Sequence, residues 1–277
     1  MRQFYPAPGK LNLFLHVVGR RPDGYHLLQS VFRFIDYGDN LQFRVREDGI
    51  VTRSNPLPGV PSERDLCVRA ARLLQRHTGC RQGVEIALDK RLPLGGGLGG
   101  GSSDAATTLL ALNRLWGLGL SRGALQQLGL QLGADVPVFV FGRSAFAEGV
   151  GERLQEVSLA PAWYVILVPP VPVSTAEVFA APELTRDTIP IKMSDFSIQH
   201  GHNDLEAVVC RKYPAVAEHL AWLKGYGDAR MTGSGGCVFA GYATGAEAGS
   251  VLAQKPHGMV GFVARGLDRH PLLDFAQ

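Results

Sequence analysis

The run Pro93-Leu94-Gly95-Gly96-Gly97-Leu98-Gly99-Gly100-Gly101-Ser102-Ser103-Asp104 places six glycines between a strand-like segment at 84–88 and a helix-like segment. Glycine has no Cβ, so its backbone can take positive φ and approach a ligand closely. The start of a helix adds unpaired N–H groups and the positive end of the helix dipole. A glycine loop that runs into a helix is therefore typical of a phosphate site. The alternative is a flexible linker, which does not usually run directly into an amphipathic helix.

Three common nucleotide-binding patterns do not fit this loop. Gly95 and Gly100 have the spacing of a P-loop, but Gly101 stands where the P-loop requires lysine. Residues 95–100 match G-x-G-x-x-G, but the acidic residue of a dinucleotide site would fall about twenty residues on, where 113–121 still has the pattern of helix and turn. The H-R-D and D-F-G segments of protein kinases are absent from the sequence.

Four other segments share a pattern with the loop: residues 7–13 (APGKLNL), 21–26 (RPDGYH), 133–137 (GADVP) and 231–239 (MTGSGGCVF). Together they resemble the GHMP kinase superfamily, whose ATP loop has the pattern Pro-x-x-x-Gly-Leu-Gly-Ser-Ser. Here Pro93, residues 97–99 and residues 102–103 match that pattern, with two additional glycines. The resemblance spans the chain, and the 21–26 segment is typical of the branch that acts on a diphosphocytidyl-linked alcohol.

The resemblance implies an ATP-dependent kinase of the α+β class, with two domains and an active site in the cleft between them. The expected domains are residues 1–160 and 161–277, because prolines cluster around a strand-like segment at 163–168. ATP is the expected co-substrate, accompanied by Mg²⁺, and the acceptor is a small molecule linked to cytidine diphosphate. There are two alternatives. One is another kinase of this superfamily, of the homoserine or mevalonate type, and the other is a nucleotide- or RNA-binding protein without catalytic activity. Residues 22–26 argue against the first, and the pair Lys10 and Asp135 argues against the second.

Lys10 and Asp135 are the predicted catalytic residues. Phosphoryl transfer requires removal of a proton from the acceptor hydroxyl and neutralisation of charge on the moving phosphoryl group. A carboxylate and a lysine suit these tasks. The resemblance implies the same roles, with Asp135 as general base and Lys10 close to it and to the γ-phosphate. Each residue alone has an ordinary structural interpretation, a turn aspartate or a solvated lysine, and only their occurrence with the glycine loop favours catalysis.

Other predicted site residues fall into two groups. ATP is expected to contact Pro93, Gly95, Gly96, Gly97, Leu98, Gly99, Gly100, Gly101, Ser102 and Ser103, although Ser103 is also a candidate helix N-cap. Substrate is expected to contact Asn12, Tyr25, His26, Thr175 and Phe179. The resemblance assigns Tyr25, His26 and Phe179 to the binding of cytidine. This is chemically reasonable, because aromatic rings stack on a pyrimidine and an imidazole can form a hydrogen bond with the edge of the base. The alternative is that these three are ordinary strand and core residues. Thr175, Ser102 and Ser103 are candidate contacts of phosphate or Mg²⁺, and no carboxylate cage for a metal is evident.

The periodicity of the sequence predicts further elements. From 10 to 17 the residues alternate, so Lys10 and Asn12 share one strand face. Strands are also expected at 25–34 and 41–45, and helices at 65–77, 103–116, 121–132, 203–211, 215–224 and 244–252. Gly133 is the expected C-cap of the third helix. Asp135 is expected at a helix-to-strand corner, because Pro137 disfavours helix at the preceding residue. Asp65 stands where the resemblance leads us to expect asparagine near the adenine pocket, and it is also a candidate N-cap.

Composition narrows the class of protein. The 277 residues carry a net charge of only +3, so nucleic acid is not an expected partner. No run of eighteen apolar residues and no signal-like N-terminus occurs, so neither a membrane span nor secretion is expected. Cys67 and Cys80 bracket one expected helix, about 20 Å long, which is too far for a disulfide. Together with Cys210 and Cys237 they fit free thiols in the cytoplasm.

Overall fold

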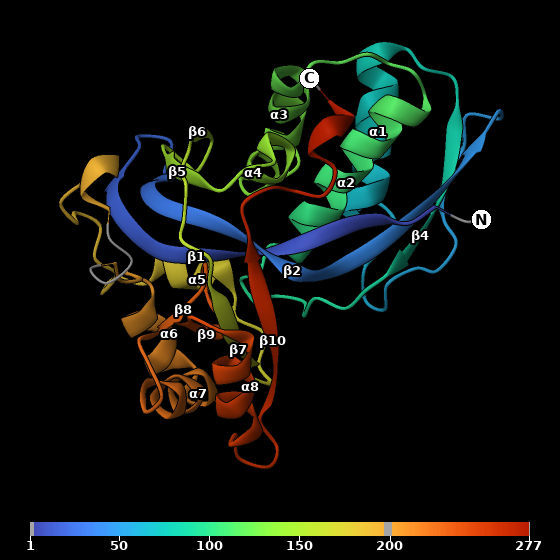
Figure 1. Cartoon of the computed structure of the whole chain (residues 1–277). Coiled ribbons are helices and arrows are strands. Elements are labelled where there is room, and N and C mark those ends of the chain that lie inside the picture. Colours follow the sequence, from blue (N-terminus) through green and yellow to red (C-terminus); the bar gives the residue numbers. More distant parts are fainter. Residues whose placement is uncertain (1–2, 197–200, 277) are drawn as a thin grey trace.

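Two long antiparallel strands, β1 (Tyr5–Arg20) and β2 (His26–Arg46), run side by side through the middle of the molecule and reach both halves of it (Figure 1). The computed structural model describes residues 3–196 and 201–276. Strand β1 contains the alternating segment that the sequence predicts, and every residue from Ala7 to His16 is buried. Both faces of this strand are therefore covered by other parts of the chain.

Strand β2 corrects one expectation, because it is continuous where the sequence predicts two strands. Residues 36–40 include Gly38 and Asp39, which locally favour a turn. Pairing with β1 outweighs that preference, since Gly38 lies opposite Pro8. A Cβ at Gly38 would stand 2.3 Å from the carbonyl oxygen of Ala7, so only glycine permits this close approach of the two backbones.

Ten strands form one mixed sheet within the described residues. Its main path runs β3-β4-β2-β10-β7-β9-β8, with β1 and β5 also paired to β2 and β6 paired to β5. The last strand of the chain, β10, lies between the two halves: Leu267 pairs with Phe34 of β2, and Ala264 pairs with Tyr164 of β7. The remaining bounds are β3 Val51–Arg53, β4 Gly83–Asp89, β5 Ala145–Glu148, β6 Arg153–Glu156, β7 Trp163–Val168, β8 Ala229–Met231, β9 Val238–Tyr242 and β10 Val260–Leu267.

The helices lie in two groups, with α1 to α4 over one half of the sheet and α6 to α8 against the other (Figure 1). Their bounds are α1 Leu66–Thr78, α2 Gly100–Leu115, α3 Arg122–Leu130, α4 Val136–Phe141, α5 Thr175–Ala180, α6 Glu206–Lys212, α7 Pro214–Lys224 and α8 Gly245–Ala253. The helices expected at 65–77, 203–211, 215–224 and 244–252 are confirmed. Thr244 and Glu247 form the capping box that starts α8.

Three helix boundaries differ from expectation. Helix α2 begins at Gly100, with Gly99 as N-cap at φ 71°, so Ser103 is inside the helix and is not its N-cap. Helix α3 ends at Leu130 with Gln131 as C-cap, so Gly133 is not the cap. Asp135 precedes helix α4 and not a strand. Pro137 is compatible with this helix because it lies in the first turn, where its missing N–H leaves no bond unmade.

Strand β1 contributes to each of the buried apolar clusters in the described part of the chain. Tyr5 belongs to the cluster under α1 to α4, Leu11 to a central cluster, and Val17 to the cluster under α5 to α8. Near the C-terminus, Leu272 and Ala276 return to the first cluster. The α+β class is confirmed. The domain boundary at residue 160 stays a prediction. Val17 precedes this boundary but packs in the cluster under α5 to α8, whereas Leu272 and Ala276 follow it but pack in the cluster under α1 to α4.

Over the described ranges, no helix is long and apolar enough to cross a membrane.

Candidate active site

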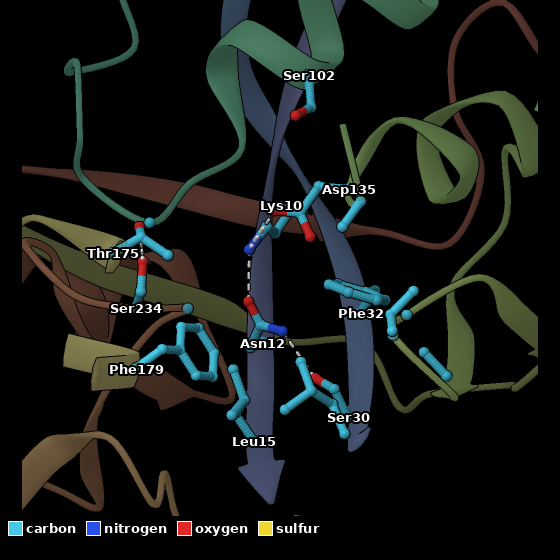
Figure 2. A pocket seen from close by; sticks show the side chains of 17 residues that line it. Lys10, Asn12, Leu15, Ser30, Phe32, Ser102, Asp135, Thr175, Phe179 and Ser234 are labelled. Carbon is cyan, nitrogen blue, oxygen red and sulfur yellow. Dashed lines mark hydrogen bonds and ion pairs between the residues drawn. The ribbon is translucent and has the colours of Figure 1, made fainter. Parts of the chain in front are cut away.

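A cavity of about 270 Å³ opens where the two halves of the molecule meet. Figure 2 shows that its side chains come from β1, β2, the start of α2, the turn before α4, α5 and the loop between β8 and β9. Residues far apart in sequence thus share one wall. The polar side chains that line it are Lys10, Asn12, Ser30, Ser102, Asp135, Thr175 and Ser234.

Lys10 and Asp135 point toward one another at the centre of this cavity (Figure 2). The Lys10 Nζ lies 3.3 Å from Asp135 Oδ2, as the predicted pairing requires. The lysine side chain is 2% exposed, whereas the aspartate side chain is 38% exposed. A buried ammonium group beside a carboxylate that still faces the cavity provides a fixed positive charge next to an accessible acidic side chain.

A chain of hydrogen bonds holds Lys10 in place. Lys10 Nζ donates to Asn12 Oδ1, Asn12 Nδ2 donates to Ser30 Oγ at 2.7 Å, and Ser30 Oγ donates to the carbonyl of Phe14 at 2.6 Å. The ammonium also lies 5.4 Å from the centre of the Phe32 ring. Both ends of the Asn12 amide are therefore bonded within the protein. Its part in substrate binding stays a prediction, and its observed contacts position Lys10.

A β-bulge decides which side chains of β1 reach the cavity. Asn12 pairs with Phe32 and Leu15 pairs with Ser30, so one extra residue of β1 is accommodated between the two pairs. Simple alternation would place Phe14 on the face of Lys10 and Asn12. After the bulge, Leu15 lines the cavity instead (Figure 2), and Phe14 packs in the central cluster.

The first half of the glycine loop docks onto the loop between β8 and β9. The N–H of Cys237 donates to the Gly96 carbonyl at 3.0 Å. Gly97 has φ 76°, and a Cβ there would stand 2.2 Å from the carbonyl oxygen of Thr232. These glycines therefore permit close packing between the two halves of the molecule, in addition to any approach to a ligand.

The second half of the glycine loop forms the first turn of α2. Gly100 to Ser102 lie at the helix start, where the backbone N–H groups have no partner within the helix. Ser102 lines the cavity, so the positive end of α2 faces it. Ser103 is turned away, because its Oγ donates to the Pro8 carbonyl at 2.7 Å and its side chain is buried.

Lys90 forms ion pairs with two carboxylates beside the glycine loop. Its Nζ lies 2.6 Å from Asp39 Oδ2 and 2.7 Å from Asp104 Oδ2. Asp39 also accepts from the N–H groups of Arg91 and Leu92. Burial raises the pKa of Asp104 to about 7, and the charge of Asp39 adds to that rise while Lys90 opposes it. One ammonium group thus holds two buried carboxylates, from β2 and from α2, at the base of the loop.

A second cavity of about 510 Å³ adjoins the first, and it contains the residues that the sequence assigns to cytidine. Tyr25, His26 and Phe179 line it, and Tyr25 is 64% exposed. The His26 and Phe179 rings lie 5.0 Å apart at 32°. The two cavities share the wall formed by Leu28, Ala134, Val150, Thr175 and Phe179, so they form one continuous cleft.

The structure brings together most of the predicted site residues, but not all. We call the first cavity the inner cavity and the second the outer cavity. The inner cavity is lined by the predicted residues Lys10, Asn12, Gly97, Ser102, Asp135, Thr175 and Phe179. Pro93, Gly95, Gly96, Leu98, Gly99, Gly100, Gly101 and Ser103 do not line either cavity, and their contacts with ATP stay predictions. Leu98 is buried, and its carbonyl accepts from the N–H of Lys10 at 2.9 Å.

Sequence reasoning missed Ser30, Phe32, Thr232 and Ser234. The hydroxyls of Ser234 and Thr175 are hydrogen-bonded, and Thr232 Oγ1 accepts from the N–H of Asn12 at 2.9 Å. Thr232 and Ser234 lie in the 231–239 segment, which is part of the resemblance to the kinase family, so that segment could have indicated them as site residues. Ser30 and Phe32 carry no local signal, since only the register of β1 on β2 places them beside Lys10.

Asp65, which stands where asparagine was expected, has both carboxylate oxygens bonded to groups of the protein. Its Oδ1 accepts from the N–H groups of Cys67 and Val68, which confirms the N-cap, and its Oδ2 lies 2.6 Å from Arg53. Both side chains are about 5% exposed or less. The carboxylate therefore faces Arg53 and its own helix, and not a ligand.

Within the described residues, no group of three or more histidine, cysteine or acidic side chains is placed to hold a metal ion. Of the carboxylates near the cleft, Asp135 pairs with Lys10 and Asp104 pairs with Lys90.

Comparison with known proteins agrees with this geometry. Residues 65–143 match the family model of the GHMP kinases N terminal domain, and residues 193–254 match that of the GHMP kinases C terminal domain. The chain is 65% identical over 275 residues to a 4-diphosphocytidyl-2-C-methyl-D-erythritol kinase of Nitrosospira multiformis, covering 98% of this chain and 94% of the relative. It is 64% identical to the kinase of the same name from Thiobacillus denitrificans, with 99% of both chains covered.

Solved structures agree as well. A crystal structure of 4-(cytidine 5'-diphospho)-2C-methyl-D-erythritol kinase superposes with a TM-score of 0.79 at 34% identity, covering 95% of this chain and 99% of that one. A mevalonate kinase superposes with a TM-score of 0.70 at 15% identity, covering 96% and 100%, which shows a common fold. The relatives match over nearly their whole length, and both family models match in order along the chain. This chain therefore belongs to the GHMP kinase family, in the group of the 4-diphosphocytidyl-2-C-methyl-D-erythritol kinases.

Proposed function

We propose that this protein transfers the γ-phosphoryl group of ATP to the 2-hydroxyl of 4-diphosphocytidyl-2-C-methyl-D-erythritol. The products are ADP and the 2-phosphate, and the step belongs to the non-mevalonate route to isoprenoid precursors. The observation that carries the proposal is the continuous cleft. Its inner cavity holds Lys10 and Asp135, and its outer cavity holds Tyr25, His26 and Phe179. A substrate with a reactive alcohol at one end and a pyrimidine at the other fits such a cleft.

The geometry supports a division of tasks between Asp135 and Lys10. Asp135 Oδ2 accepts the proton of the acceptor hydroxyl as that oxygen attacks phosphorus. Lys10 orients Asp135 and stabilises negative charge on the transferred group. The N-terminus of α2, beside Ser102, faces the phosphates of the nucleotide. Magnesium bound to ATP would supply positive charge to the phosphates, and the hydroxyl of Ser102, which lines the cavity at the helix start, would be available to hold it.

A direct assay tests the proposal. The purified protein is incubated with MgATP and, separately, 4-diphosphocytidyl-2-C-methyl-D-erythritol, homoserine, mevalonate and methylerythritol 4-phosphate, and ADP release is measured. Phosphorus NMR locates the new monoester. We expect turnover with the first acceptor only, with phosphate at its 2-oxygen. Equal turnover with homoserine or mevalonate would contradict the substrate, and no turnover with any acceptor would contradict catalysis.

The proposal places the reaction in the cytoplasm, in line with the unpaired thiols of Cys67, Cys80, Cys210 and Cys237.

A further inference from the structure

Arg186 joins the two walls of the outer cavity, although it lies outside the motifs that resemble the kinase family. Its Nε donates to His26 Nε2 at 3.1 Å, at the start of β2. Its Nη2 donates to the carbonyls of Phe179 and Ala181 at 3.1 and 2.7 Å, and its Nη1 donates to the Leu184 carbonyl at 2.9 Å. One planar guanidinium group thus ties the end of α5, which carries Phe179, to the imidazole of His26.

The bond from Arg186 determines which nitrogen of His26 carries the proton. Arginine only donates hydrogen bonds, so His26 Nε2 must accept and must carry no proton. Neutral imidazole then has its proton on Nδ1. Within the described part of the chain, Nδ1 has no hydrogen-bond partner, so its N–H is available to a ligand in the outer cavity.

Charged groups around His26 favour the same neutral form. Burial lowers the pKa of His26, and the positive charges of Arg186 and Arg20 lower it further. Asp23 also lines this cavity, but it pairs with Arg21 at 2.7 Å. The imidazole is therefore surrounded mainly by cations, which oppose its protonation.

We propose that Arg186 is a positioning residue for base selection: it fixes His26 as an Nδ1–H donor, and this donor distinguishes cytosine from uracil. The inference rests on the proposed function. Cytosine presents N3 as a hydrogen-bond acceptor, whereas uracil presents N3–H, a donor. A donor on His26 bonds the first and opposes the second, which is discrimination through an unfavourable contact with the wrong ligand. The opposite tautomer, with Nδ1 bare, would favour uracil.

The kinetic test compares Arg186→Met, Arg186→Lys and wild type with the cytidine substrate and its uridine analogue. We expect Arg186→Met to raise the KM of the cytidine substrate about 10-fold and to reduce the preference for cytidine over uridine, in kcat/KM, by about 10-fold or more. The KM of ATP should not change. Arg186→Lys should recover only part of the preference, because one ammonium cannot bond His26 and the three carbonyls of Phe179, Ala181 and Leu184 together.

Two controls separate positioning from general damage. Arg211→Met removes an exposed arginine that pairs with Glu183 on the same segment, and it should leave both KM values unchanged. In a His26→Ala background, Arg186→Met should no longer change the preference between the two bases, because Arg186 acts through His26. If Arg186→Met raises both substrates' KM equally, Arg186 only supports α5, and the inference is overturned.

A spectroscopic test does not depend on activity. The protein labelled with ¹⁵N-histidine should show His26, identified by its loss in His26→Ala, as the Nδ1–H tautomer in wild type. In Arg186→Met the tautomer should shift toward Nε2–H, with a higher pKa. An Nε2–H imidazole in wild type would overturn the inference. Turnover of both nucleoside substrates with equal efficiency would also overturn it while leaving the kinase function intact, whereas no turnover of either would count against the kinase function.

Discussion

Asp135 and Lys10 differ in exposure, and that difference supports the separate tasks proposed for them. The carboxylate is 38% exposed and can meet a substrate, whereas the ammonium is almost completely buried and is tied to Asn12. A charge held in place by the protein needs no reorganisation when negative charge develops during the reaction. At the scale of single residues, the site therefore consists of one accessible carboxylate, Asp135, beside a lysine that buried hydrogen bonds hold in place.

The variant Asp135→Asn tests this assignment. It keeps the shape of the side chain but removes the base, so turnover should fall by about 10²–10⁴-fold. The KM of ATP should change little, because the carboxylate serves the acceptor hydroxyl. Steady-state kinetics with each substrate varied in turn provide the measurement, and thermal unfolding serves as the control for folding. Turnover close to that of wild type would show that Asp135 is not the base.

At the scale of elements, the glycine loop between β4 and α2 holds the two halves together through its contacts with the loop between β8 and β9. Gly97→Ala adds a Cβ against the Thr232 carbonyl at a residue with φ 76°. Gly119 is a matched control, since its φ is 66° and a Cβ there would meet nothing within 4 Å. Gly119→Ala should lower the free energy of unfolding by about 1 kcal/mol and leave kinetics unchanged. Gly97→Ala should lower it further and reduce kcat by about 10²-fold. Equal effects of the two variants on kcat would show that the close packing has no part in activity.

The cluster of Lys90, Asp39 and Asp104 makes a prediction about pH. Lys90→Met leaves two buried carboxylates without their cation, so we expect a loss of about 3–5 kcal/mol of stability at pH 8. The folded pKa of Asp104 is raised to about 7, above its unfolded value, so folding takes up a proton and stability falls as pH rises toward 7. Without Lys90 that pKa rises further, so the loss should be smaller at pH 5 than at pH 8.

Denaturant unfolding at several pH values measures this effect. The double variant Lys90→Met/Asp104→Asn removes one of the uncompensated charges and should flatten the pH dependence. A loss in Lys90→Met that is the same at pH 5 and pH 8 would contradict the electrostatic explanation.

At the scale of the whole molecule, the cleft is formed only when both halves are in place, because Phe179 comes from α5, whereas Tyr25 comes from the β1–β2 turn and His26 from the start of β2. Stacking on a base contributes roughly 1–3 kcal/mol. Phe179→Ala should therefore raise the KM of the cytidine substrate by about 5- to 150-fold and leave the KM of ATP unchanged. Phe262→Ala, which removes an aromatic ring stacked on Tyr37, is the control. A KM for the cytidine substrate unaffected by Phe179→Ala would remove the stacking role.

Local patterns predicted much of this molecule, and long-range contacts explain the rest. Residue alternation predicted β1, and the candidate N-cap Asp65 marked the start of helix α1. The continuity of β2 was not predictable, because pairing with Pro8 and Ala7 outweighs the turn preference of Gly38. The bulge that turns Leu15 into the cavity is likewise a property of the paired strands and not of either strand alone.

The position of β10 has a consequence for synthesis. This strand holds residues 260–267 of 277, yet it lies between β2 and β7 in the finished sheet. At a translation rate of about 5–20 residues per second, β2 waits on the order of ten seconds or more for its neighbour. During that interval the nascent chain exposes unpaired strand edges, which are sites of aggregation. A chain that ended before residue 260 would therefore lack the strand that joins β2 to β7, and the edges of both strands that β10 covers would stay open.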